Sequence, residues 1–345
     1  MTERIERLRV GLEEPLLVTS SVNVRYLTGF ASSNAALLVE PHRVQLFTDF
    51  RYAEAARRVP EVEFVETKRS VVADLAERLS GRIGFEADHL RYAGYETLAA
   101  GGTELVPRSG LVERLRAVKD ETELDAIRTA AAITSEAYAR LAEERFVGRT
   151  ERELAWRMEE LFHELGAHGL AFPVVLATGP NGARPHAEPG ERTVERGQTI
   201  VVDAGCSIDG YCSDCTRTFA AAPLPGELKE AYAACLQGQE AGLQAVAPGR
   251  SGVEVDGVAR GVIDAAGYGK EFGHGLGHGV GLLVHEAPRL SPDSSDDLAA
   301  GNVVTVEPGI YLEGVGGIRI EDLVVVREGD ADVLTSFTKA LVTVG

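Results

Sequence analysis

Short apolar runs alternate with helix-forming stretches along the first third of the chain. Four of the runs have the length and the apolar character of strands. These runs are 15–19, 35–39, 44–48 and 82–86. Between them, residues 52–58 and 70–80 are rich in Ala, Leu, Glu and Arg, which favour helices. The alternation predicts a small α/β domain.

A long stretch without Pro or Gly follows, from Leu111 to Glu144. Apolar residues recur in it at helical spacing. They are Leu115, Val118, Leu124, Ile127 and Ala131. We therefore predict one long helix that begins where the first domain ends, with an N-terminal domain at 1–115 and a C-terminal domain at 116–345.

Two segments of the C-terminal domain resemble one another. Gly148-Arg-Thr-Glu-Arg-Glu153 matches Gly249-Arg-Ser-Gly-Val-Glu254, which lies 101 residues later. Each segment contains a Ser/Thr-x-x-Glu capping box, which marks the start of a helix. Both predicted helices end at glycines with the same offset, Gly166 and Gly267.

The strands repeat as well, because Gly197-Gln-Thr-Ile-Val-Val-Asp203 resembles Gly301-Asn-Val-Val-Thr-Val-Glu307, with an offset of 104. Since both matches keep the same order, we predict that the C-terminal domain consists of two related helix–helix–strand halves facing one another. The carboxylate that ends each strand is costly to bury unless something pairs with it.

Each repeated acid is followed by a turn and by a second acid on the return strand. In the first half, a turn centred on Ile208 and Asp209 would place Asp203 directly opposite Asp214. A turn centred one residue later makes this pair diagonal but keeps it on one face. In the second half, a loop centred on residue 314 places Glu307 opposite Glu321.

Four carboxylates therefore converge if the halves face one another. Like charges at this spacing require cations. A solvated hairpin position is the alternative for any one of the acids taken alone.

Residues 271–286 supply histidines for such a site. His274, His278 and His285 stand among five glycines at alternate positions, a spacing that disfavours a helix and an ordinary strand. This pattern suits a backbone that passes close to another group, although a solvated Gly-rich loop is the plainer alternative. Four acids with a histidine suit two divalent ions, with Mn²⁺ favoured and Zn²⁺, Co²⁺ or Fe²⁺ possible. Such pairs recur in hydrolases.

Composition limits the choice of partners and compartment. The chain has 345 residues and a net charge of −18, which argues against binding to nucleic acid or to anionic membranes. The charged first residues do not resemble a signal peptide, and no apolar run approaches the roughly 20 residues needed to cross a bilayer. We expect a soluble cytoplasmic protein. Cys212-Ser-Asp-Cys215 has C-x-x-C spacing, but it interrupts an acid hairpin, so packed free thiols are expected rather than a redox pair.

The motifs that carry this chemistry resemble those of the pita-bread metallopeptidases. They are Asp203-Ala-Gly205, Tyr211-Cys-Ser-Asp-Cys-Thr-Arg-Thr218, His274-Gly-Leu-Gly-His278, His285-Glu286, Glu307-Pro-Gly-Ile-Tyr311 and Arg319-Ile-Glu-Asp322. Tyr26-Leu-Thr-Gly-Phe30 and Thr48-Asp-Phe-Arg-Tyr52 resemble the N-terminal domain of the Xaa-Pro aminopeptidase and Xaa-Pro dipeptidase (prolidase) branch. The resemblance implies an α/β (α+β) fold, in which a creatinase-like domain precedes a pita-bread domain.

The resemblance also implies a role for each matching position. The implied metal ligands are Asp203, Asp214, His278, Glu307 and Glu321. Asp214 and Glu321 would bridge the two ions, and Glu307 would also be the general base. Of the other implied site residues, His186 lines the substrate pocket, His274 and His285 hold the scissile peptide and move protons, and Arg319 orients the bridging carboxylates.

The implied reaction is cleavage of the Xaa-Pro bond of proline-containing peptides. We also predict a homodimer, because two-fold dimers are the commonest oligomers and an N-terminal domain beside an open cleft can close that cleft from a neighbouring subunit. An aminopeptidase is favoured, with a dipeptidase as the alternative, for which Arg184 could hold the proline carboxylate. A same-fold peptidase of different specificity is a further alternative. A protein of this fold that only binds peptides would be expected to lose ligands, and this chain keeps all five.

Overall fold

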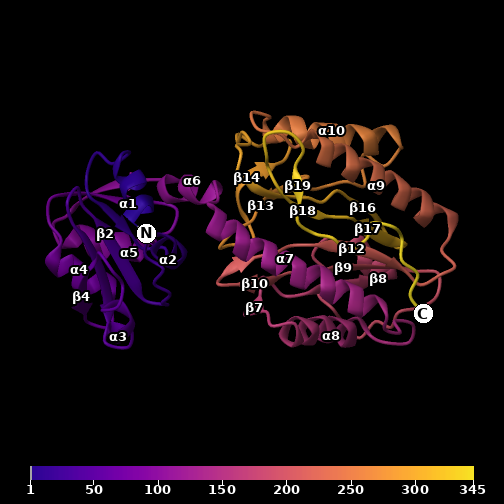
Figure 1. Ribbon diagram of the computed structural model, residues 1–345, viewed down its shortest axis with the longest axis horizontal. Coiled ribbons are helices and arrows are strands. Elements are labelled where there is room, and N and C mark those ends of the chain that lie inside the picture. The colour runs from indigo at the N-terminus through magenta and orange to yellow at the C-terminus, as the bar shows by residue number, and fades with distance from the viewer. Residues whose placement is uncertain (1) are drawn as a thin grey trace. The chain divides into compact units, whose positions relative to one another are not determined.

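The computed structural model describes residues 2–345 and divides into two units, one up to Arg116 and one from Ala117 onward (Figure 1). The predicted apolar runs of the first unit are strands of one six-stranded sheet, ordered β4-β3-β2-β1-β5-β6. Its strands are β1 (Leu16–Val18), β2 (Ala35–Val39), β3 (Val44–Asp49), β4 (Glu63–Thr67), β5 (Arg82–Glu86) and β6 (Glu104–Arg108). Its helices are α1 (Thr2–Arg9), α2 (Ser21–Thr28), α3 (Ala53–Ala56), α4 (Val71–Arg78), α5 (Tyr92–Ala100) and α6 (Leu111–Ala117).

The core of the first unit lies between the sheet and α4 and α5. Leu17 of β1 packs there with Leu75 and Leu98, and all three side chains are fully buried. Burying a leucine side chain stabilises the fold by about 1.5–3 kcal/mol, so these contacts hold the helices on the sheet.

The predicted long helix is wrong, because the chain breaks it into α6 and α7 (Glu121–Ala142). Asp120 has an extended backbone and accepts a hydrogen bond from the Glu123 amide, while the Glu123 side chain accepts one from the Asp120 amide. This capping box begins a new helix at a point where no Pro or Gly marks a break.

The second unit has four long helices and several short antiparallel sheets. Its further helices are α8 (Glu151–Glu164), α9 (Gly226–Ala245), α10 (Gly252–Ala265) and the 3₁₀ turn η1 (Gly179–Ala183). Strands of the first half are β7 (Gly169–Leu170), β8 (Val175–Thr178), β9 (Thr199–Asp203), β10 (Cys206–Ile208), β11 (Tyr211–Cys212) and β12 (Thr216–Ala220). Strands of the second half are β13 (Gly277–Gly279), β14 (Glu286–Leu290), β15 (Val303–Val306), β16 (Gly309–Leu312), β17 (Gly316–Arg319), β18 (Asp322–Val325) and β19 (Asp332–Val333). Figure 1 shows α7 and α8 beside the first set, with α9 and α10 beside the second.

The internal repeat is present in the structure. Thr150 and Ser251 both cap their helices and receive the reciprocal bond from the glutamate three residues on. Gly166 and Gly267 follow the two helices with φ of 88° and 92°, a left-handed conformation that glycine adopts without strain.

The two hairpins differ in how well their register follows from the sequence. The first turn is centred on Asp209 and Gly210, one residue beyond the first-choice position, and both have positive φ. Asp203 therefore pairs with Thr216, and Asp214 lies diagonally from it. In the second half, the strands on either side pair as Val306↔Asp322 and Gly309↔Arg319. Both pairs have the same register, and in this register Glu307 stands opposite Glu321, as predicted.

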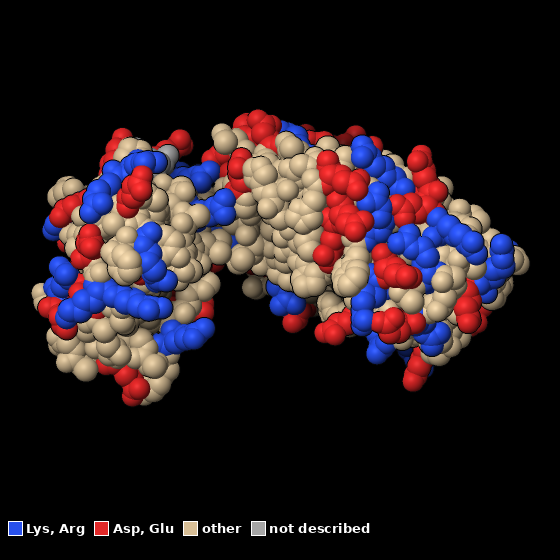
Figure 2. Space-filling model, turned by 90° about the horizontal axis from the view of Figure 1, so that it is seen from below, with Lys and Arg blue, Asp and Glu red and all other residues tan. Residues whose placement is uncertain are grey.

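None of the described helices is both long and apolar enough to cross a membrane. On the face drawn in Figure 2, basic side chains lie among acidic ones and form no continuous basic surface.

Candidate metal centre

The five proposed ligands are held by the edges of three antiparallel ladders in the second unit. Asp203 ends β9 and Asp214 precedes β12, whereas His278 lies in β13. Glu307 follows β15, and Glu321 separates β17 from β18. Asp214 and Glu321 are buried, and the other three are half-buried.

These side chains converge on one point. Carboxylate oxygens of Asp203, Asp214 and Glu321 lie within 4.8 Å of one another. The Nε2 atom of His278 is 3.1 Å from a Glu307 oxygen and 3.7 Å from an Asp214 oxygen. The structure thus brings together all five positions that the sequence singled out.

Crowding of like charges perturbs the acids. Burial, reinforced by the neighbouring carboxylates, raises the pKa of Asp214 and of Glu321 well above the usual range. Burial also raises the pKa of Asp203, although Arg319 opposes it. Burial also acts to raise the pKa of Glu307. The hydrogen bond to His278 opposes this effect, and the pKa of Glu307 is lowered to about 2.

Two carboxylate oxygens in the cluster are buried without a hydrogen-bond donor among the described residues. They are Oδ1 of Asp203 and Oε1 of Glu321. Leaving a buried acceptor unsatisfied costs about 1–3 kcal/mol or more when it is charged, so such atoms need an explanation. Divalent cations supply one, because carboxylate oxygens and an imidazole nitrogen are the donors that first-row metals take. The residues present therefore fit a pair of metal ions.

Other side chains hold the acids in place. Thr216 donates to one oxygen of Glu321 at 2.8 Å, and Thr305 donates to Glu307 at 2.9 Å. Sequence reasoning gave these threonines no role. The signal was their position two residues from Asp214 and from Glu307, because residues two apart on a strand share a face.

Arg319 is buried and reaches two sides of the cluster. It donates to Asp203 at 2.6 Å, and its Nε lies 4.0 Å from Glu307. It also donates to the Tyr311 hydroxyl at 2.9 Å, which in turn is 2.9 Å from Nε2 of His274. Tyr311 is a further site residue whose role the sequence did not reveal, although it stands in one of the quoted motifs.

Three further histidines, His186, His274 and His285, lie near the acids. The His285 ring packs 4.4 Å from that of His278. Burial lowers the pKa of His274 and of His285, and nearby His186 adds to the lowering of both. The chain leading to His186 is fixed by Arg319, which donates to the Pro185 carbonyl at 3.1 Å.

The two cysteines of the C-x-x-C spacing are buried. Cys215 packs in the core between α7, α8 and β9, whereas Cys212 packs in a different cluster with Leu124. Burial raises the pKa of the Cys215 thiol well above its usual range. A reactive thiol needs the opposite shift, so Cys215 has the character of a packing residue.

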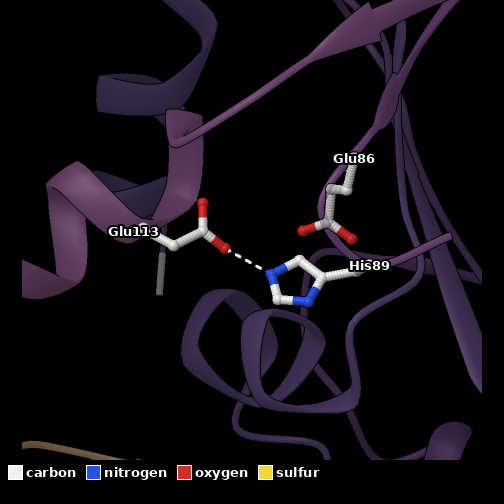
Figure 3. Close-up of side chains that lie close together, drawn as sticks. All are labelled: Glu86, His89 and Glu113. Carbon is white, nitrogen blue, oxygen red and sulfur yellow. Dashed lines mark hydrogen bonds and ion pairs between the residues drawn. The ribbon is translucent and has the colours of Figure 1, made fainter. Parts of the chain in front are cut away.

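A second group of potential ligands lies in the first unit. Glu86, His89 and Glu113 place one ligand atom each within 4.8 Å of one another (Figure 3). Here protein donors hold both acids, because Asn23 donates to an oxygen of each and His89 is 2.8 Å from Glu113. The other oxygen of Glu86 accepts the amides of Thr19 and Ser20. This group therefore links α2 and α6 to β5. It differs from the acid cluster of the second unit, where two buried carboxylate oxygens have no donor among the described residues.

Comparison with known proteins decides the family. Residues 125–328 match the model of metallopeptidase family M24, and residues 4–118 match the creatinase/prolidase N-terminal domain. The chain belongs to metallopeptidase family M24. The expected fold class, a creatinase-like α/β domain before a pita-bread domain, is thereby confirmed, and the M24 chain is a metallopeptidase and a hydrolase.

Relatives of this M24 protein include both a Xaa-Pro dipeptidase and an X-Pro aminopeptidase. An uncharacterized peptidase of Bacillus subtilis, YqhT, is 36% identical, and the match covers 98% of this chain and 99% of that one. The structure of a Xaa-Pro dipeptidase from Bacillus anthracis superposes with a TM-score of 0.95 at 35% identity, covering 99% of both chains. An X-Pro aminopeptidase from Thermotoga maritima gives a TM-score of 0.89 at 33% identity, covering 99% of this chain and 100% of that one.

Proposed function

We propose that the protein is a dinuclear-metal exopeptidase that hydrolyses the Xaa-Pro bond at the N-terminus of peptides. The observation that carries this proposal is the cluster of four acids and His278, in which two buried carboxylate oxygens lack a donor. Its placement in an M24 fold, and the names of relatives that act on Xaa-Pro bonds, support the substrate class.

Asp203, Asp214, His278, Glu307 and Glu321 would hold two divalent ions. Mn²⁺ suits the carboxylate-rich set best, with Zn²⁺ or Co²⁺ as alternatives. When bound, the ions would supply a hydroxide nucleophile at neutral pH and stabilise the negative charge that develops on the scissile carbonyl. The chain's own contribution is to fix the ligands, and Thr216, Thr305 and Arg319 do this by the bonds described above.

The proton-carrying groups of the proposed mechanism are Glu307 and the histidines. Glu307 is oriented by Thr305 and faces the other acids, which suits a general base. His274 and His285 approach the cluster from the Gly-rich segment, where they can hold the peptide and pass a proton to the leaving amine. His186 lies near both and would contact the substrate.

Aminopeptidase activity is the first candidate and dipeptidase activity the second. A dipeptidase must hold a free proline carboxylate, which needs a cation beside the pocket. Arg184 stands two residues before His186, but its exposed guanidinium is already bonded to the Asn181 side chain at 2.5 Å. This engagement argues against Arg184 as a carboxylate clamp and so supports an aminopeptidase.

The deciding experiment compares a Xaa-Pro dipeptide with a Xaa-Pro-Xaa tripeptide on Mn²⁺-loaded protein. We expect the higher kcat/KM on the tripeptide. A large preference for the dipeptide would favour the second candidate, and loss of that preference in Arg184→Ala would identify the clamp. Hydrolysis of neither peptide would contradict the proposed substrate class.

A further inference from the structure

Helix α10 contributes none of the proposed ligands, yet it carries an ion pair between a buried acid and a partly exposed arginine. Asp256 and Arg260 lie one turn apart, and Nε and Nη2 of Arg260 each donate to one Asp256 oxygen at 2.8 Å. Asp256 is 1% exposed. Such a fork-to-fork pair fixes the guanidinium in one orientation, because both of its bonds must be kept.

The pair holds the main chain around His274. Arg260 donates from Nη1 to the Phe272 carbonyl at 2.9 Å and from Nη2 to the His274 carbonyl at 2.7 Å. Asp256 accepts the Leu276 amide at 3.0 Å. Three main-chain groups within five residues are thus tied to two side chains of α10.

The same pair also fixes the His274 ring through Phe272. The Arg260 guanidinium stacks 4.2 Å from the Phe272 ring, and that ring meets His274 edge-on with centroids 5.2 Å apart. With its loop held, His274 places Nδ1 2.7 Å from the Gly275 carbonyl and Nε2 2.9 Å from the Tyr311 hydroxyl. Both ring nitrogens are therefore oriented.

Helix α8 does the same for the other half of the domain. Glu151 is fully buried, and its oxygens accept the amides of Thr178 at 2.9 Å and Gly190 at 3.0 Å and the Asn181 side chain at 3.0 Å. The loop between these contacts carries His186. The position equivalent to Glu151 in the second half, 101 residues later, is Gly252. The two halves therefore hold their histidine loops with different, non-equivalent residues.

We propose that Asp256 and Arg260 are positioning residues for His274, and that Glu151 positions His186, so that helices outside the metal cluster set the geometry of its two flanking histidines. This inference rests on the proposed function. A lysine at 260 keeps the charge, but it lacks the planar fork and has three N–H donors, whereas Arg260 makes four hydrogen bonds. Displacing a catalytic group by about 1 Å can cost on the order of 10²-fold in rate.

The test is a double-mutant cycle of Arg260→Lys and His274→Ala, measured as kcat/KM on a Xaa-Pro-Xaa peptide with Mn²⁺-loaded protein. We expect Arg260→Lys to lower kcat about 10–100-fold with unchanged bound metal, and to have no further effect in the His274→Ala background. An equal loss in both backgrounds, or no loss in either, would overturn the proposal. An inactive wild type would instead refute the proposed function.

Two controls separate positioning from general stability. Arg152, on α8, forms an exposed ion pair with Glu191. Arg152→Lys alters this pair and should leave kcat unchanged. Hydrogen exchange should accelerate at residues 272–276 in Arg260→Lys, independently of activity, and unchanged exchange there would contradict the role of the pair. For the other half, Glu151→Gln should lower kcat/KM in the wild type but not in His186→Ala.

Discussion

Glu321 shows in one side chain what the cluster requires. One of its oxygens accepts the Thr216 hydroxyl, and the other is buried with no donor among the described residues. Its neighbours Asp203 and Asp214 are also acids, so without cations the group repels itself. The sequence could predict these acids because each stands at a strand end in a repeated pattern. It could not predict the role of Tyr311, because this role depends on how the β16–β17 hairpin, which also carries Arg319, packs against the distant loop of His274.

Glu321→Gln should have opposite effects on the two properties that depend on this crowding, which are metal binding and the stability of the metal-free protein. The neutral amide is a poorer ligand for divalent cations than a carboxylate, so bound metal should fall from two ions per chain to one or none, with nearly all hydrolysis lost. In metal-free protein the same change removes one of several crowded charges, and we expect the unfolding temperature to rise by a few degrees, since about 1 kcal/mol corresponds to roughly 2–4 °C at this size. Metal analysis and calorimetry measure both. Two ions retained in the variant would contradict the ligand assignment.

Asp49 provides a pH prediction away from the metal cluster. Its side chain is buried and is bonded to Arg51. The bond from Arg51 holds the pKa of Asp49 well below its usual range. A depressed folded-state pKa means that this stabilisation is present above the unfolded value of about 3.9 and is lost as the pH falls toward the folded one.

The Asp49→Asn variant should therefore be less stable than the wild type near neutral pH, and the difference should shrink below about pH 4. Urea unfolding at several pH values measures it. A difference that stays constant down to pH 2 would show that the carboxylate charge is not what stabilises the fold.

At the scale of elements, local signals were reliable where they were chemically specific. The capping boxes at Thr150 and Ser251 gave the starts of α8 and α10, and the glycines gave their ends. Asp120 and Glu123 have capping-box spacing as well, but the break before α7 was not predicted because no Pro or Gly interrupts the helical stripe there. The first hairpin register was ambiguous by one residue because Asp209 adopts positive φ, which a non-glycine residue seldom does.

Removing a capping side chain should cost a predictable amount of stability. Thr150→Ala and Ser251→Ala should each lower the free energy of unfolding by about 1 kcal/mol, since each leaves a helix amide without its acceptor. Ser295→Ala, at an exposed loop position, is the matched control and should change it by less than about 0.5 kcal/mol. Equal effects in all three variants would argue that the caps do not stabilise these helices.

At the scale of the whole molecule, the two units have different tasks. All five proposed ligands lie in the second unit, and the first contributes none of them. The N-terminal α/β character could be predicted from alternating apolar runs, but strands β4 and β6 could not, because β4 is only partly buried and β6 contains a proline. The arrangement of helix pairs around the metal cluster followed from the repeat, since matched halves each bury a face against their own strands.

We predict that the protein is a homodimer, because two-fold dimers are the commonest oligomers. Sedimentation velocity at micromolar concentration should give twice the mass of 36.8 kDa. A single monomer boundary across the concentration range would exclude this assembly.

The central claim is that two metal ions in the acid cluster make this chain a Xaa-Pro peptidase. Its most direct test measures hydrolysis of a Xaa-Pro-Xaa tripeptide by chelator-treated protein, before and after titration with Mn²⁺. The account predicts almost no activity in the metal-free protein and recovery that saturates at two ions per chain, with Asp214→Ala remaining inactive throughout. Full activity in protein shown to contain no metal would contradict it.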